Sequence, residues 1–202
     1  MNSPRLTPAR LEAAGIGAFF RPRDLEALAI PFAELKRLVA AGTVEKVSPG
    51  LYRIAAAEPS EFETLAMVAS AIPGAIVCLL SALTLHGIGT QAPHEVWLAL
   101  DRKARKPSRL PARVRVFRFS GATLSYGIET RHLLGVPVRL TSAARTIVDC
   151  FRYRSKIGLD VALEALRDAI GSRKVTVDEI VRAADVLRAR TVISPYLEAL
   201  AP

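Results

Sequence analysis

The order of apolar and polar residues between positions 15 and 54 predicts a helix, a short turn, a second helix and then a hairpin. In the second helix, the apolar residues that recur three and four positions apart, and so form an inward face, are Phe32, Leu35, Leu38 and Val39. Pro31 can open this helix, because the first turn does not need its missing N–H, and Gly42 can end it. The outward face is left with two cations between two small residues: Ala33, Lys36, Arg37 and Ala40.

Two short β-prone runs follow this helix, at 44–47 and 51–54, and Ser48-Pro49-Gly50 joins them. Pro followed by Gly suits the two central positions of a type II turn. A hairpin of this size cannot bury itself, so we expect it to lie against the helices as a wing. This order is that of a winged helix-turn-helix and favours DNA binding. Small helical modules with hairpins also serve as protein-docking domains, and that alternative stays open.

The winged domain is predicted over residues 1–57 and a second domain over residues 58–202. Strands of the second domain are expected at 76–80, 95–100, 114–119, 125–134 and 136–140. Its helices are expected to have N-terminal caps at Ser60, Ser81, Thr141 and Thr176. Pro195 is expected at the start of the last helix. The predicted fold class is therefore α+β, an N-terminal winged helix-turn-helix followed by a mixed α+β C-terminal domain.

The net charge of +9 is concentrated in one short segment. Residues 58–101 carry five acidic residues and no Lys or Arg, whereas residues 102–118 carry eight cations and no acid. Charge focused in this way attracts polyanions more strongly than the same charge spread out. We expect the segment to contact nucleic acid or an acidic partner, with Trp97 and Phe117 as apolar support. A solvated connector is the alternative.

Residues that could carry catalysis or bind a metal are scattered along the chain. His86, His94 and His132 lack the spacing of metal ligands, and no phosphate-binding loop, nucleophile elbow or Cys/His dyad is present. Cys78 and Cys150 lie among aliphatic residues, which is typical of inert, reduced core thiols. We therefore predict no catalytic residue, no metal and no cofactor.

Two pairs of charged residues need separate interpretation. Glu95 and Asp101 stand at the two ends of a predicted strand and resemble the acid-x-Lys element of metal-dependent nucleases. Because the neighbouring strand at 76–80 offers no further acid to hold a metal ion, a nuclease is the less favoured alternative. Arg145 and Asp149 stand four positions apart on a predicted helix, and we expect an ion pair that fixes this helix against the sheet.

The first residues alternate charged and apolar side chains and lack the continuous apolar core of a signal peptide. The longest apolar run, 76–80, is too short to cross a bilayer. We therefore expect a cytoplasmic protein with no membrane partner.

Several sequence blocks together resemble the AbiEi family of antitoxins. The N-terminal block is GAFFRPRDLEAL…ELKRLVAAGTVEKVSPGLYRI, with the G-x-Y-R ending of the wing. Blocks similar to the family's second domain are LLSALTLHGI at 79–88, HEVWLAL at 94–100 with RKARKP after it, and TSAARTIVDC at 141–150. Ala29 stands in the helix-turn-helix where similar proteins often have Gly.

The resemblance implies a non-enzymatic antitoxin of a type IV toxin–antitoxin system. Such a protein represses its own operon by binding inverted repeats in promoter DNA, which suit a homodimer with two-fold symmetry. Its functional partner is a nucleotidyltransferase-like toxin, countered directly or through the toxin's target. The alternative is a protein- or RNA-interaction module that uses residues 102–118.

The resemblance also implies roles for individual residues. Lys36 and Arg37 would lie at the major groove, where guanine is the expected target, and Ala33 and Ala40 would allow close approach. Contacts to the DNA backbone are implied for Arg21, Arg23, Lys46 and Arg53. A second basic surface, for DNA or the toxin, would consist of Arg102, Lys103, Arg105 and Lys106.

Overall fold

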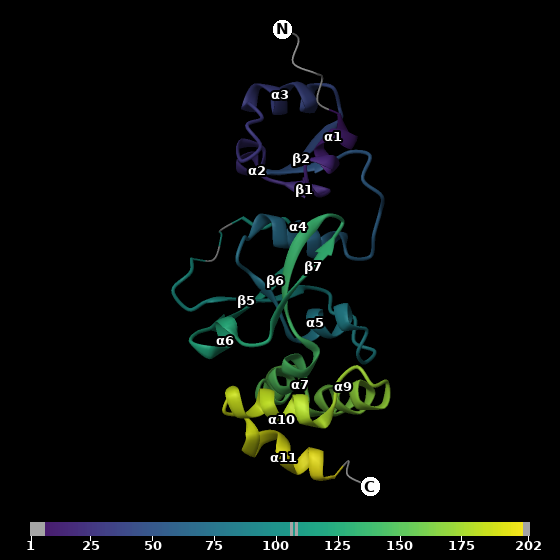
Figure 1. The fold of residues 1–202 in the computed structure, drawn as a ribbon, viewed down its shortest axis with the longest axis vertical. Helices are drawn as coiled ribbons and strands as arrows, with labels where there is room; N and C mark the ends of the chain where they lie inside the picture. Colours follow the sequence, from purple (N-terminus) through teal and green to yellow (C-terminus); the bar gives the residue numbers. More distant parts are fainter. Residues whose placement is uncertain (1–6, 106, 108, 200–202) are drawn as a thin grey trace. The chain divides into compact units, whose positions relative to one another are not determined.

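The computed structural model describes residues 7–105, 107 and 109–199, and its fold is mixed α+β, as predicted (Figure 1). Contacts divide it into two compact units. The first is formed by Met1–Gly74, Pro107–Arg113 and Thr130–Val138, and the second by Ala75–Lys106, Val114–Glu129 and Arg139–Pro202. These units are defined by contacts rather than by chain order, and a boundary between folding domains after residue 57 stays a prediction.

The first unit contains the winged helix-turn-helix. Its helices are α1 (Pro8–Ala13), α2 (Pro22–Glu26), α3 (Phe32–Ala40) and α4 (Glu63–Ala71). Its antiparallel sheet has the order β1-β3-β2, made from β1 (Phe19–Phe20), β2 (Val44–Ser48) and β3 (Leu51–Ile54). Gly50 has a φ of 73°, which the third position of a type II turn requires. The core under the helices is formed mainly by Leu11, Phe20, Leu25, Leu35, Leu38 and Ile54.

Both helices of the helix-turn-helix end in the same kind of hydrogen-bonded turn. At the end of α2, the Ile30 amide donates to the Leu25 carbonyl at 3.0 Å, the long-range bond of a Schellman motif. This motif places one residue in the left-handed region, and here it is Ala29, with a φ of 56°. At the end of α3 the same place is taken by Gly42, with a φ of 67°. An alanine therefore occupies a position that suits glycine.

The predicted inward face of α3 is confirmed at Leu35 and Leu38, which are buried, but is wrong at Phe32. The Phe32 side chain is 49% exposed. Helical side chains point toward the helix N-terminus, so a residue in the first turn projects past the end of the core. Periodicity alone carries no information on where the core ends.

The second unit contains most of a mixed sheet of order β6-β5-β4-β8-β7, although residues 130–138, in β7 and β8, belong to the first unit. Its strands are β4 (Ile76–Val77), β5 (Val96–Asp101), β6 (Val114–Phe119), β7 (Ile128–Leu133) and β8 (Val136–Thr141). Strand β4 runs antiparallel to β5 and parallel to β8, and β6 lies parallel to β5 at the edge of the sheet.

The helices of this unit gather on one side of the sheet (Figure 1). They are α5 (Leu79–His86), α6 (Ala122–Ser125), α7 (Ala143–Arg152), α8 (Arg154–Ile157), α9 (Leu159–Gly171), α10 (Val177–Val186) and α11 (Arg190–Glu198). Helices α5, α7, α9, α10 and α11 share a hydrophobic core with Trp97, Ala99 and Phe119 of the sheet. No helix in the part of the chain described is long and apolar enough to cross a membrane.

Several predicted element boundaries are wrong. The strand predicted at 76–80 stops at Val77, because Cys78 already caps α5. Ser81 therefore lies inside α5, where its hydroxyl accepts a hydrogen bond from the Trp97 amide at 2.9 Å. The strand predicted at 125–134 begins only at Ile128, since α6 ends at Ser125 and a turn at Tyr126 and Gly127 follows it.

Helix caps could be predicted less reliably than the helices themselves. Helix α4 begins after Phe62 rather than Ser60, and α7 is capped by Ser142 rather than by Thr141, which ends β8. Pro195 lies inside α11 rather than at its start. The capping box of α10 is confirmed, since the Glu179 carboxylate accepts the Thr176 amide at 2.8 Å.

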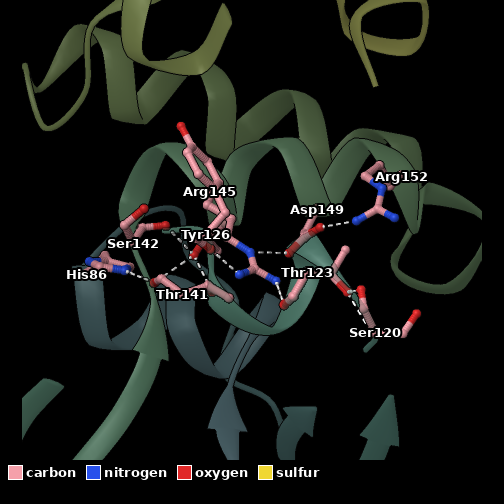
Figure 2. Close-up of polar contacts among 10 residues, drawn as sticks. His86, Ser120, Thr123, Tyr126, Thr141, Ser142, Arg145, Asp149 and Arg152 are labelled. Atoms are coloured by element: carbon pink, nitrogen blue, oxygen red, sulfur yellow. Dashed lines mark hydrogen bonds and ion pairs between the residues drawn. The ribbon is translucent and has the colours of Figure 1, made fainter. Parts of the chain in front are cut away.

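A buried ion pair fixes α7 in place (Figure 2). The Arg145 and Asp149 side chains are both 0% exposed, and Arg145 Nε donates to Asp149 Oδ2 at 3.2 Å. The same guanidinium donates to the Thr123 carbonyl at 2.6 Å and lies over the Phe119 ring, 4.9 Å from its centroid. Arg152 completes the cluster by donating to Asp149 Oδ1 at 2.7 Å. The predicted pair is confirmed as a structural link between α7 and strand β6.

Candidate nucleic-acid interface

The outward face of α3 presents one lysine between small residues. Ala33, Lys36 and Ala40 are all exposed, as the spacing of the buried positions predicted. The Lys36 Nζ lies 5.5 Å from the centroid of the Phe32 ring, one helical turn earlier. A small-residue surface with a free cation can approach a polyanionic backbone closely.

Arg37 shares this face, but its charge is already paired. Its guanidinium forms a two-point contact with Glu34, with Nε donating to Oε2 at 2.9 Å and Nη2 donating to Oε1 at 2.5 Å. The hydrogen bond to Glu34 raises the pKa of Arg37 above its ordinary value, because it favours the charged form. Sequence reasoning missed this partner, although spacing of three residues on a helix allows such a pair.

Three further predicted DNA contacts lie around α2 and the wing. Arg21 is the N-terminal cap residue of α2 and is half-buried, and its backbone amide donates to Asp24 Oδ2 at 2.7 Å. Arg23 is exposed, with its Nε 3.8 Å from Asp24 Oδ1. Lys46 is exposed on β2. The side chains of Arg23 and Lys46 are therefore both accessible to solvent.

Arg53, the fourth of these residues, lies in a different environment. Its side chain is only 19% exposed, and its Nη2 donates to the Ala57 carbonyl at 3.1 Å. Its Nε lies 3.1 Å from Glu63 Oε1, at an angle unsuited to a hydrogen bond. Glu45 lies 3.9 Å from its Nη1. These contacts hold Arg53 between the wing and the start of α4.

Comparison with known proteins decides the family of this winged helix. Residues 9–55 match the family model described as a transcriptional regulator, AbiEi antitoxin. The winged helix is similar to that of AbiEi family antitoxins. The resemblance noted from the sequence is thereby confirmed over this segment, whereas the similarity of the three later blocks to AbiEi antitoxins stays a prediction.

The fold as a whole has a counterpart among solved structures. The crystal structure of the RV2827C protein from Mycobacterium tuberculosis superposes with a TM-score of 0.53 at 12% sequence identity. The alignment covers 98% of this chain and 84% of that protein. At such low identity the likeness concerns the fold alone. No curated protein matches this chain.

The second predicted basic surface is only partly described. Arg102, Lys103 and Arg105 are exposed in the turn after β5, whereas Lys106 lies outside the described residues. Arg118 of β6 holds this turn by donating to the carbonyl of Ala104 at 2.6 Å. The turn thus presents cations on a backbone that is fixed at its base.

Arg115 extends the cationic edge along β6. Its Nε lies 2.7 Å from Glu95 Oε1, and its guanidinium lies 4.6 Å from the centroid of the Trp97 ring. Phe117, also on β6, stacks on Trp97 with the ring centroids 5.4 Å apart. Trp97 of β5, which is buried, is the register partner of Arg115, so the predicted aromatic support lies on the edge strand and on the strand next to it.

The acids that suggested a nuclease are engaged in structural contacts. Glu95 pairs with Arg115, and Asp101 Oδ1 accepts the Lys103 amide at 2.7 Å. Strand β4 supplies only Ile76 and Val77 beside them. Within residues 7–105, 107 and 109–199, no three His, Cys, Asp or Glu side chains are grouped so that they could hold a metal ion.

The two cysteines are buried in the core of the second unit, as predicted. Burial raises the pKa of both thiols, and the nearby Asp149 carboxylate acts in the same direction. The thiolate, which is the reactive form, is therefore strongly disfavoured.

Proposed function

We propose that this chain is a non-enzymatic type IV antitoxin of the cytoplasm that represses its own operon. The winged helix binds inverted repeats in the promoter as a homodimer, and α3 enters the major groove. The counterpart is a nucleotidyltransferase-like toxin encoded beside it, and residues 58–202 carry the antitoxin activity.

The observation that carries the proposal is the exposed face of α3 within a winged helix of the AbiEi regulator family. Lys36 projects from this face between Ala33 and Ala40, and Arg23 and Lys46 lie exposed on the flanking elements. In helix-turn-helix proteins the second helix enters the groove, and flanking cations hold the phosphate backbone.

The contacts of the other cations refine the assignment of roles. Lys36 is the main cation of α3 that is available to the DNA, because Arg37 is held by Glu34. Arg53 acts structurally, since its guanidinium is mostly buried against Glu63 and Ala57. Arg23 and Lys46 contact phosphates, with Arg21 beside them.

The test is binding to the promoter fragment of this chain's own gene, measured by gel shift. The double variant Lys36→Ala/Arg37→Ala is expected to lose binding while its circular dichroism spectrum is unchanged. Lys156→Ala removes one exposed cation from α8 of the second unit and is the control, with wild-type affinity expected. Wild-type affinity for the double variant would show that α3 does not contact the DNA.

A second candidate role belongs to the basic turn after β5, because Arg102, Lys103 and Arg105 are exposed there on a braced backbone. This turn would bind an acidic protein or RNA. Changing all three residues to alanine separates the roles: a repressor keeps its preference for the promoter, whereas an interaction module of this kind loses its partner.

A further inference from the structure

The turn of the helix-turn-helix is an exposed apolar surface. It spans residues 27–33, ALAIPFA, and contains no charged or hydrogen-bonding side chain. Leu28 and Phe32 are 39% and 49% exposed, and every other residue of the run except the partly buried Ile30 is exposed as well. Contiguous apolar side chains at a surface indicate a binding site rather than a solvent-facing element.

Phe32 begins α3, and the first residues of a recognition helix are those that contact base edges. Ala33 lies beside it and adds no bulk that would keep the helix away from DNA. The Lys36 ammonium, 5.5 Å from the Phe32 ring centroid, gives the apolar surface a cation at its border. An exposed apolar surface with a cation at its border suits a ligand that is a polyanion carrying an apolar group.

In the major groove only one base carries an apolar group on its edge, the 5-methyl group of thymine. We propose that Phe32, supported by Ala33, packs against thymine methyl groups in the operator and makes the protein prefer thymine there. The proposal rests on the proposed function, and it makes Phe32 a specificity-determining residue. Lys36 then supplies attraction to the phosphates or to a neighbouring acceptor.

The experiment compares two versions of the promoter fragment of this chain's own gene, one containing thymine and one synthesised with uracil instead. The pairing edges are the same, and only the methyl groups are missing. Wild-type protein is expected to bind the uracil fragment about fourfold more weakly for each methyl group in contact, as the burial of one CH₂ predicts.

Phe32→Ala is expected to bind both fragments equally, because the side chain that senses the methyl group is gone. Its fold is expected to persist, since the ring contributes little to the core, and circular dichroism checks this. Val47→Ala is the matched control: it truncates an exposed apolar side chain on the wing, outside the turn, and should keep the wild-type preference for thymine.

Each other outcome overturns the inference in a different way. Equal binding of both fragments by wild type, with Lys36→Ala still weakening it, would refute methyl recognition and leave the proposed function standing. If Phe32→Ala keeps the full preference for thymine, a residue other than Phe32 makes the contact with the methyl group. Loss of self-association in Phe32→Ala, with no thymine preference in wild type, would make the turn an interface between copies. Failure of wild type to prefer the promoter over unrelated DNA would remove the proposed function itself.

Discussion

Replacing Ala29 by glycine is expected to stabilise the protein, although the change removes a side chain. Ala29 has a φ of 56° in the turn that ends α2. An L-residue in the left-handed region costs about 1–2 kcal/mol, and glycine avoids this cost. Glycine also loses more backbone entropy on folding, roughly 0.5–1 kcal/mol relative to alanine. The difference is a net gain of about 0.5–1 kcal/mol in the free energy of unfolding.

The reverse substitution at the end of α3 provides the matched control. Gly42 has a φ of 67° in the same kind of turn, and a Cβ built on it would contact nothing within 4 Å. Gly42→Ala therefore tests the backbone effect without a steric clash, and it is expected to lower the free energy of unfolding by about the same amount.

Urea denaturation followed by far-ultraviolet circular dichroism measures both variants, with a higher midpoint expected for Ala29→Gly and a lower one for Gly42→Ala. Loss of stability in both variants would refute the reasoning. In that case the turn after α2 would have another backbone conformation.

Three further substitutions have expected outcomes. Glu34→Gln should tighten promoter binding in an anisotropy titration, because it frees Arg37 and removes an anion from α3; unchanged binding would place Arg37 outside the interface. Gly17→Ala should destabilise the protein by about 1–3 kcal/mol, since its Cβ would lie 2.6 Å from the Gly135 carbonyl carbon within the first unit. Gly171→Ala is the control and should not destabilise the protein, because a Cβ at Gly171 would have open space around it. Hydrogen bonds from Thr90 lower the pKa of Glu164. The stability that these bonds give is therefore present at pH values above the ordinary pKa of glutamate, and it is lost as the pH falls through the lowered pKa. Glu164→Gln should therefore flatten the acid side of the melting-temperature profile, and an unchanged profile would contradict that linkage.

Local patterns predicted the winged helix because each of its elements has a local cause. The buried Leu35 and Leu38, the helix end at Gly42 and the turn at Gly50 all depend on residues a few positions apart. The capping box at Thr176 was predictable for the same reason. In such segments the periodicity, the turn residues and the packing agree.

The features that sequence reasoning missed depend on contacts between segments. The partner of Arg53 is Glu63, ten residues away beyond the wing, so its guanidinium could not be assigned from the pattern of the hairpin. Phe32 continues the apolar periodicity of α3, but the core ends before it. The two-residue length of β4 depends on where α5 begins, and no residue in the run 76–80 indicates that point.

The claim that Lys36 of α3 meets the DNA backbone or a base is tested most directly by the salt dependence of promoter binding. The logarithm of the association constant falls with the logarithm of the salt concentration by about 0.9 for each phosphate contact. Lys36→Ala should weaken binding, and if the lysine meets a phosphate it should also lower this slope by roughly one contact, whereas Lys156→Ala should match wild type in both respects. Identical affinity and identical slope for wild type and Lys36→Ala would contradict the account.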